Sequence, residues 1–128
     1  MLTAARFSFP AKTSELEALG QFIASHCQDS KRVLIELAIT EVVVNAIKHG
    51  QASRITVEIE DVGEEFKLIV SDDGSPFNPT QQKALPMGEL REGGYGLGIV
   101  EQVSSYCGYQ FQEGHNYLTL HFSKGDLS

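Results

Sequence analysis

Apolar residues cover most of the circumference of a segment with helical periodicity between residues 33 and 50. Its apolar side chains are Val33, Leu34, Leu37, Ile39, Val42, Val43 and Ile47. This pattern predicts a buried helix. At 100° per residue, Asn45 and Lys48 lie about 40° and about 20° to either side of Glu41, so the three share one polar stripe. Buried polar groups need partners. The three side chains therefore either pair with one another or face a cleft that holds a charged molecule.

The remaining pattern predicts strands joined mainly by hairpins, with helices grouped in blocks. The first helix is capped by Thr13 or Ser14 and ends near Gln28, and Asp29 or Ser30 caps the helix that ends near Gly50. Strands are predicted over 6–9, 54–60, 65–71, 109–113 and 117–122, and a third helix over 95–106. This order predicts an α+β two-layer sandwich with a mixed, mostly antiparallel sheet and helices on one face. The loop over 75–93 holds three of the four prolines and has the length of a lid.

Composition places the chain among single-domain proteins and excludes several classes of function. Its 128 residues suit one domain, with 41% hydrophobic and 21% charged residues. The formal charge of −7 disfavours nucleic acid as a partner. No apolar run approaches the ~18 residues of a membrane span. The N-terminus is too short and polar for a signal peptide, so we expect a cytoplasmic protein.

Each member of the polar stripe has a functional and a structural interpretation. Glu41 suits a general base in phosphoryl transfer, or one half of a buried ion pair with Lys48 or His49. Asn45 suits a neutral oxygen ligand of Mg²⁺, or an amide bonded to the helix backbone. Lys48 suits a phosphate contact, or a solvated cation at the negative helix end. His49 has no metal-ligand spacing with the other histidines and suits a capping or packing role.

Two later segments favour a ligand cleft over internal pairing. Asp72 ends a predicted strand, where its carboxylate could accept a hydrogen bond from an exocyclic amine, and Gly74 lets the backbone approach a flat ring closely. A plain Asp-Gly turn is the alternative. The glycine-rich run over 93–98 precedes a predicted helix, and exposed N–H groups at a helix start bind anions. Its spacing does not fit a Rossmann fingerprint, and the absence of a Gly-Lys dipeptide excludes a Walker A loop.

Together these segments resemble a known family. The order Glu-x-x-x-Asn-x-x-x-His, Asp-x-Gly and Gly-x-Gly-Leu-Gly resembles the N, G1 and G2 boxes of the Bergerat-fold ATPases, which include histidine kinases and gyrase-type topoisomerases. The stretches over 40–50 and 72–79 look like those of bacterial anti-sigma-factor serine kinases. The resemblance covers about residues 6 to 123. Pro76 stands where the broader superfamily has a second glycine, a variant typical of the anti-sigma branch that leaves gyrase-type lid motion in doubt.

The resemblance implies a role for each matched residue. Glu41 would be the catalytic base, Asn45 the Mg²⁺ ligand, and Asp72 the acceptor for the adenine amine. Thr119 resembles, more weakly, a threonine that supports adenine recognition. The predicted nucleotide-binding residues are Asn45, Lys48, His49, Asp72, Gly74, Gly94, Gly96, Leu97, Gly98 and Thr119.

The resemblance also implies a function for the whole chain, residues 1–128, as one histidine-kinase-like ATPase domain with an ATP lid. It would be an anti-sigma factor with protein serine/threonine kinase activity, using ATP and Mg²⁺. Its partners would be an anti-anti-sigma protein of the STAS type and a sigma factor, and it would form a homodimer. The alternatives are a nucleotide-dependent binding module without turnover and a detached histidine-kinase ATPase domain.

Overall fold

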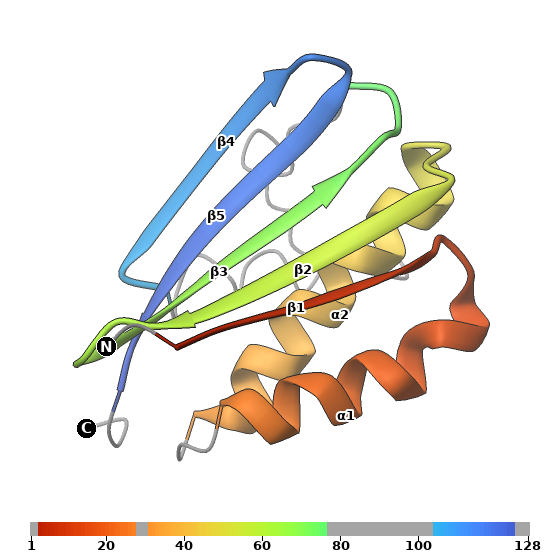
Figure 1. Cartoon of the computed structure of the whole chain (residues 1–128). Helices are drawn as coiled ribbons and strands as arrows, with labels where there is room; N and C mark the ends of the chain where they lie inside the picture. Colours follow the sequence, from red (N-terminus) through yellow and green to blue (C-terminus); the bar gives the residue numbers. More distant parts are fainter. Residues whose placement is uncertain (1–2, 28–30, 77–103, 125–128) are drawn as a thin grey trace, which may run out of the picture.

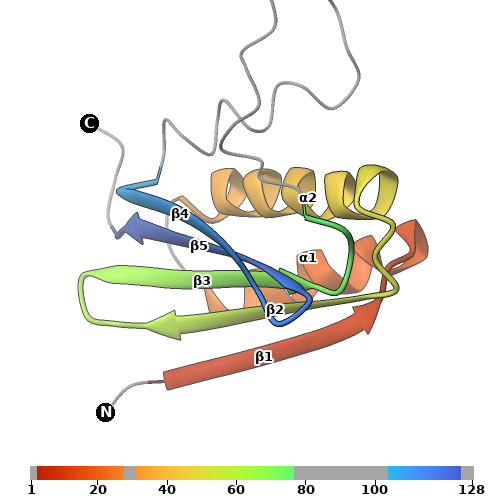
Figure 2. The same cartoon turned by 90° about the horizontal axis from the view of Figure 1, so that it is seen from above.

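The residues that the structure describes fold into two layers, a five-stranded sheet and two helices packed on one of its faces (Figure 1, Figure 2). The computed structural model describes residues 3–27, 31–76 and 104–124. Within this part of the chain the helices are α1 (Leu16–His26) and α2 (Arg32–His49), and a 3₁₀ turn (Thr13–Glu15) precedes α1. The strands are β1 (Thr3–Pro10), β2 (Arg54–Asp61), β3 (Glu65–Asp72), β4 (Tyr106–Gln112) and β5 (His115–Ser123).

The sheet has the strand order β1-β2-β3-β5-β4, and each neighbouring pair is antiparallel. Figure 1 shows β5 between β3 and β4, so the last strand in sequence does not form an edge. The predicted α+β fold, with a mostly antiparallel sheet and helices on one face, is confirmed.

Buried and more exposed side chains alternate along β2, β3 and β5, and the buried ones face the helices. In β2, β3 and β5 the buried apolar residues on this face are Ile55, Val57, Ile59, Phe66, Leu68, Val70, Leu118, Leu120 and Phe122. Successive strand side chains point to opposite faces, so these residues form one continuous apolar surface. They form one hydrophobic core with the buried sides of α1 and α2. Cys27, just after α1, is fully buried in this core.

Helix α2 is buried on one side rather than around its circumference. Ile39 and Val43 are fully buried, whereas Val33 is 65% exposed and Leu37 is 47% exposed. In a two-layer fold a helix has a sheet beneath it but no second layer of described residues above it. The prediction of a helix buried nearly all round was therefore wrong for its outward face.

Several predicted boundaries were also wrong. Thr13 and Ser14 do not cap α1, because both lie in the 3₁₀ turn, and Glu15 is the N-cap of α1. Lys31 is the N-cap of α2, whereas Asp29 and Ser30 lie outside the described residues. Strand β4 begins at Tyr106, so the predicted third helix cannot extend to that residue. Residues 95–103 of that helix, and most of the predicted lid, lie outside the described part of the chain.

The described helices give no membrane-spanning candidate. Neither of them has the combination of length and apolar character that crossing a bilayer requires.

Candidate functional site

A narrow hollow lies between α2 and one end of the sheet. The cavity that it encloses is small, ≈ 20 Å³, and the rest of the hollow is open to solvent. The lining residues are Val42, Ala46 and Gly50 from the α2 side and Val70, Asp72, Tyr109, Asn116 and Leu118 from the sheet. The walls are thus mainly aliphatic, with polar groups contributed by the sheet. Apolar walls with a few fixed polar groups suit a flat ring that has a hydrogen-bonding edge.

Asp72 is the acidic group of this hollow. It is buried at the end of β3, with 9% of its surface exposed. Its Oδ1 accepts hydrogen bonds from the Gly74 backbone N–H at 2.8 Å and from Asn116 Nδ2 at 3.0 Å. Both hydrogen bonds that the described residues donate to this side chain therefore end on the same oxygen atom. This arrangement holds the carboxylate in a fixed orientation and leaves Oδ2 as the acceptor for a ligand.

Asn116 is a site residue that the sequence reasoning missed. It lies directly opposite Asp72 in the pairing of β3 with β5 and is only 5% exposed. The predicted strands over 109–113 and 117–122 leave 114–116 between them as a turn, but the structure places the turn at Glu113 and Gly114, which have φ angles of 51° and 78°. A signal was present in the sequence. Asn116 continues, toward the N-terminus, the alternation of buried positions that includes Leu118.

Gly74 makes a close backbone contact that only glycine allows. A Cβ atom at this position would lie 2.3 Å from the Gly50 carbonyl oxygen. The next residue, Ser75, donates its backbone N–H to the same oxygen at 2.8 Å. The turn after β3 is thus fastened to the end of α2, which joins the two walls of the hollow. The sequence reasoning had assigned the need for glycine to a ligand ring, whereas the structure shows the Gly50 backbone at this place.

Helix α2 carries two buried polar atoms that lack partners. Asn45 is 6% exposed, and its Nδ2 has no hydrogen-bond partner among the described residues. The same holds for Oε1 of Glu41, one helical turn earlier. Burial raises the pKa of Glu41 above its usual value, and the positive charge of Lys48 partly opposes this shift. A half-buried carboxylate with a raised pKa is poised to accept a proton, and pKa values perturbed by burial are frequent at functional sites.

The structure also places three further residues of the predicted site, Lys48, His49 and Thr119. Lys48 and His49 are exposed at the end of α2. Within the described residues Lys48 forms no ion pair with Glu41, so the structure does not show the buried pair considered above.

Thr119 is separated from Asn116 by an odd number of positions in β5, so it lies on the opposite face of the sheet from Asp72. The structure does not bring Thr119 to this site. Residues 94 and 96–98 lie outside the described part of the chain.

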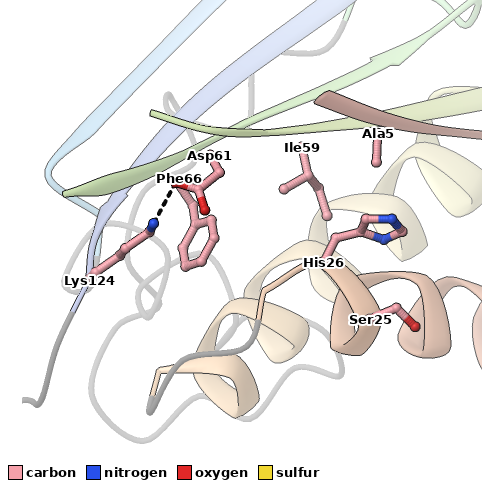
Figure 3. A pocket seen from close by; sticks show the side chains of 7 residues that line it. All are labelled: Ala5, Ser25, His26, Ile59, Asp61, Phe66 and Lys124. Carbon is pink, nitrogen blue, oxygen red and sulfur yellow. Dashed lines mark hydrogen bonds and ion pairs between the residues drawn. The ribbon is translucent and has the colours of Figure 1, made fainter. Parts of the chain in front are cut away.

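A second cavity lies at the other end of the sheet, near the end of α1 (Figure 3). Its cavity volume is ≈ 410 Å³. It is lined by Ala5, Ser25, His26, Ile59, Asp61, Phe66 and Lys124. The Lys124 ammonium forms an ion pair with Asp61, and it also lies 4.6 Å from the centre of the Phe66 ring. These charged groups already have partners. In the hollow beside α2, no described residue donates to Oδ2 of Asp72, so this hollow is the better candidate site. Glu41 and Asn45 do not line it, although they precede Val42 and Ala46, which do.

Comparison with known proteins identifies the family. A family model described as "Histidine kinase-like ATPase domain" matches residues 9–122. The chain belongs to this family. Membership implies ATP binding, typically together with Mg²⁺.

Two curated relatives are protein kinases. Serine/threonine-protein kinase BtrW of Bordetella bronchiseptica is 28% identical over 87 residues, which cover 65% of this chain and 61% of BtrW. Serine-protein kinase RsbW of Staphylococcus aureus is 31% identical over 81 residues, covering 53% of this chain and 51% of RsbW. The matched part thus spans only about half to three fifths of these relatives.

Solved structures share the fold. The crystal structure of the RsbU and RsbW domains of a Mycobacterium tuberculosis protein superposes with a TM-score of 0.66 at 17% identity, covering 95% of this chain and 32% of that one. The Acinetobacter baumannii histidine kinase AdeS gives a TM-score of 0.59 at 18% identity, covering 98% of this chain and 70% of that one. At these identities the likeness concerns the fold alone.

Proposed function

We propose that this chain is an anti-sigma factor and a protein serine/threonine kinase. It uses Mg-ATP to phosphorylate a serine or threonine of a STAS-type anti-anti-sigma partner, and it binds a sigma factor as a homodimer. The observation that carries the kinase proposal is the pair of buried atoms without partners on α2, Oε1 of Glu41 and Nδ2 of Asn45. The kinase names of BtrW and RsbW support the same reaction.

The residues present fit a magnesium nucleotide. Burying polar atoms without hydrogen bonds is costly, and a bound ligand that supplies partners removes this cost. The unpartnered Nδ2 of Asn45 is a donor, so a phosphate oxygen would be its partner. The amide oxygen of the same side chain would hold Mg²⁺, consistent with the preference of this ion for oxygen ligands. When bound, the ion neutralises charge on the phosphates. The hollow lined by Val42, Val70 and Leu118 would hold the adenine ring, with Asp72 at its amino group.

Glu41 would act as the general base. As the partner's hydroxyl oxygen attacks the γ-phosphorus, Glu41 takes the hydroxyl proton, and the bond from the γ-phosphorus to the bridging oxygen breaks to release ADP. The raised pKa makes its carboxylate a better proton acceptor than an ordinary glutamate. A binding module without turnover would have no use for a base at this position.

The test is to identify the phosphorylated residue by mass spectrometry. The protein is incubated with ATP, with either Mg²⁺ or EDTA, and with STAS-type proteins encoded beside it. We expect phosphoserine or phosphothreonine on one STAS protein, only in the presence of Mg²⁺. Phosphohistidine would indicate a histidine-kinase ATPase domain. ATP binding without any phosphorylated product would indicate a binding module.

A further inference from the structure

Three polar side chains form a chain of hydrogen bonds along the hollow beside α2. The Tyr109 hydroxyl, on the edge strand β4, donates to Oδ1 of Asn116 on β5. Asn116 Nδ2 then donates to Oδ1 of Asp72 at 3.0 Å and to the Ser75 carbonyl oxygen at 2.9 Å. Tyr109, Asn116 and Asp72 all line the hollow. An edge strand is thereby connected to the acidic group that would contact a ligand.

The partners of Asn116 determine which way its amide points. A carboxylate and a carbonyl oxygen can only accept hydrogen bonds, so the amide NH₂ must face Asp72 and Ser75. The amide oxygen then faces Tyr109, whose hydroxyl donates to it. If the amide rotated by half a turn, its oxygen would face two acceptors. The tyrosine hydroxyl is thus the donor that holds the amide oxygen away from Asp72.

This orientation also determines what Asp72 offers to a ligand. Its Oδ1 accepts from the Gly74 N–H and from the Asn116 amide, so Oδ2 is left as a fixed acceptor. A fixed acceptor attracts a ring that carries an amino group and repels a ring that carries a carbonyl oxygen at the same place. A buried site of this kind discriminates strongly because the wrong ligand leaves polar groups unpaired.

We propose that Tyr109 is a positioning residue that makes the site select adenine over hypoxanthine, acting through Asn116 and Asp72. This inference rests on the proposed nucleotide-binding function. Hypoxanthine carries an oxygen in place of the exocyclic amino group and a proton on the neighbouring ring nitrogen N1, so it reverses the hydrogen-bonding edge that adenine would present to Asp72. Tyr109 does not itself contact the reacting phosphates in this scheme, and its effect is on base selection.

The test compares ADP and IDP, the hypoxanthine analogue, by isothermal titration calorimetry on the full chain. Tyr109→Phe removes only the hydroxyl. We expect ADP affinity to fall about five- to tenfold, because the Asn116 amide loses its partly buried donor and Asp72 is then less well fixed as the acceptor. IDP affinity should change less than about twofold, so the preference for ADP narrows. The matched control is Tyr106→Phe, on the same strand but 52% exposed, which should leave both affinities unchanged.

Other outcomes would overturn the inference in distinct ways. An unchanged ADP:IDP ratio in Tyr109→Phe, or equal losses for both ligands, would give the hydroxyl a structural role only. Asn116→Leu tests the same connection without changing the tyrosine, and retention of the full ratio there would also contradict the proposal. A wild-type protein that binds neither nucleotide would overturn the proposed function itself, whereas selective wild-type binding with an insensitive Tyr109→Phe overturns only this inference.

Discussion

Two groups of polar side chains differ in how their hydrogen bonds are satisfied. One group lines the hollow beside α2, and the other lies on α2, next in sequence to residues that line it. At the sheet end, Asp72, Asn116 and Tyr109 are joined to one another by hydrogen bonds. On α2, Oε1 of Glu41 and Nδ2 of Asn45 have no partner among the described residues. The first group is organised before any ligand arrives, as recognition requires. The second lacks partners that a ligand would supply, which suits groups that act on a charged substrate.

The difference predicts opposite responses to mutation. Removing a member of the joined group leaves a donor or an acceptor without its partner, which destabilises the protein. Removing the charge of an unpaired group relieves a cost of burial and should impair only function. Stability and activity, measured on the same variants, therefore test the comparison directly.

The largest effect is expected for Glu41→Gln. The amide keeps the shape but cannot take a proton, so phosphoryl transfer should fall by about 10²–10⁴-fold while ATP still binds. Because burial raises the pKa of Glu41, its ionised form is disfavoured in the folded state, so the variant should be as stable as wild type at pH 7, or more stable. Any gain should be absent below the unfolded-state pKa, near the ordinary value of 4.5. Thermal melts at several pH values measure the stability of the variant, and a phosphotransfer assay measures its activity.

The control for this variant is Glu36→Gln, which changes a glutamate on the same helix outside the polar stripe. It should retain phosphotransfer. A Glu41→Gln protein that melts much earlier than wild type at pH 7 would contradict the comparison, because it would show that the ionised carboxylate has a stabilising partner.

An intermediate effect is expected for Asp72→Ala, in both affinity and stability. The variant removes the acceptor that Gly74 and Asn116 share, and a lost charge-assisted hydrogen bond costs roughly 1.5–3 kcal/mol. ATP affinity, measured by calorimetry, should therefore fall by at least about tenfold. Urea denaturation should show a lower free energy of unfolding, unlike Glu41→Gln. Unchanged ATP affinity in the folded variant would place adenine elsewhere.

The smallest effect is expected at Asp73, the exposed neighbour of Asp72. Its carboxylate accepts hydrogen bonds from the Ser53 hydroxyl and from the backbone N–H groups of Ser53 and Arg54, which lower its pKa to about 2. A lowered pKa stabilises the fold above the ordinary value of 3.8, and this stabilisation is lost as pH falls toward about 2. Asp73→Asn should lower the melting temperature by a few degrees at pH 7. Its melting curve should approach that of wild type near pH 2, and a difference that persists there would contradict the assignment.

The nucleotide-box motifs and the periodicity of the chain were readable without the structure. Alternation identified β2 and β3 nearly to the residue, and helical spacing placed Glu41 and Asn45 on one stripe. These features are local, because the 3.6- and 2-residue periods are set by the backbone within one element. The helix starts were less accurate, since a polar residue near a boundary does not identify the cap by itself.

The tertiary structure alone decided which distant residues meet. The pairing of β3 with β5 places Asn116 opposite Asp72, although 44 positions separate them, and the Gly50 carbonyl reaches the turn at Gly74. Strand register is set by contacts between segments far apart in sequence, and a shift of one residue moves a side chain to the other face. For that reason Thr119, three residues beyond Asn116, lies away from the site that the resemblance had assigned to it. The sequence by itself determined which elements form and what chemistry they carry, whereas register and helix packing decided which of those groups face one another.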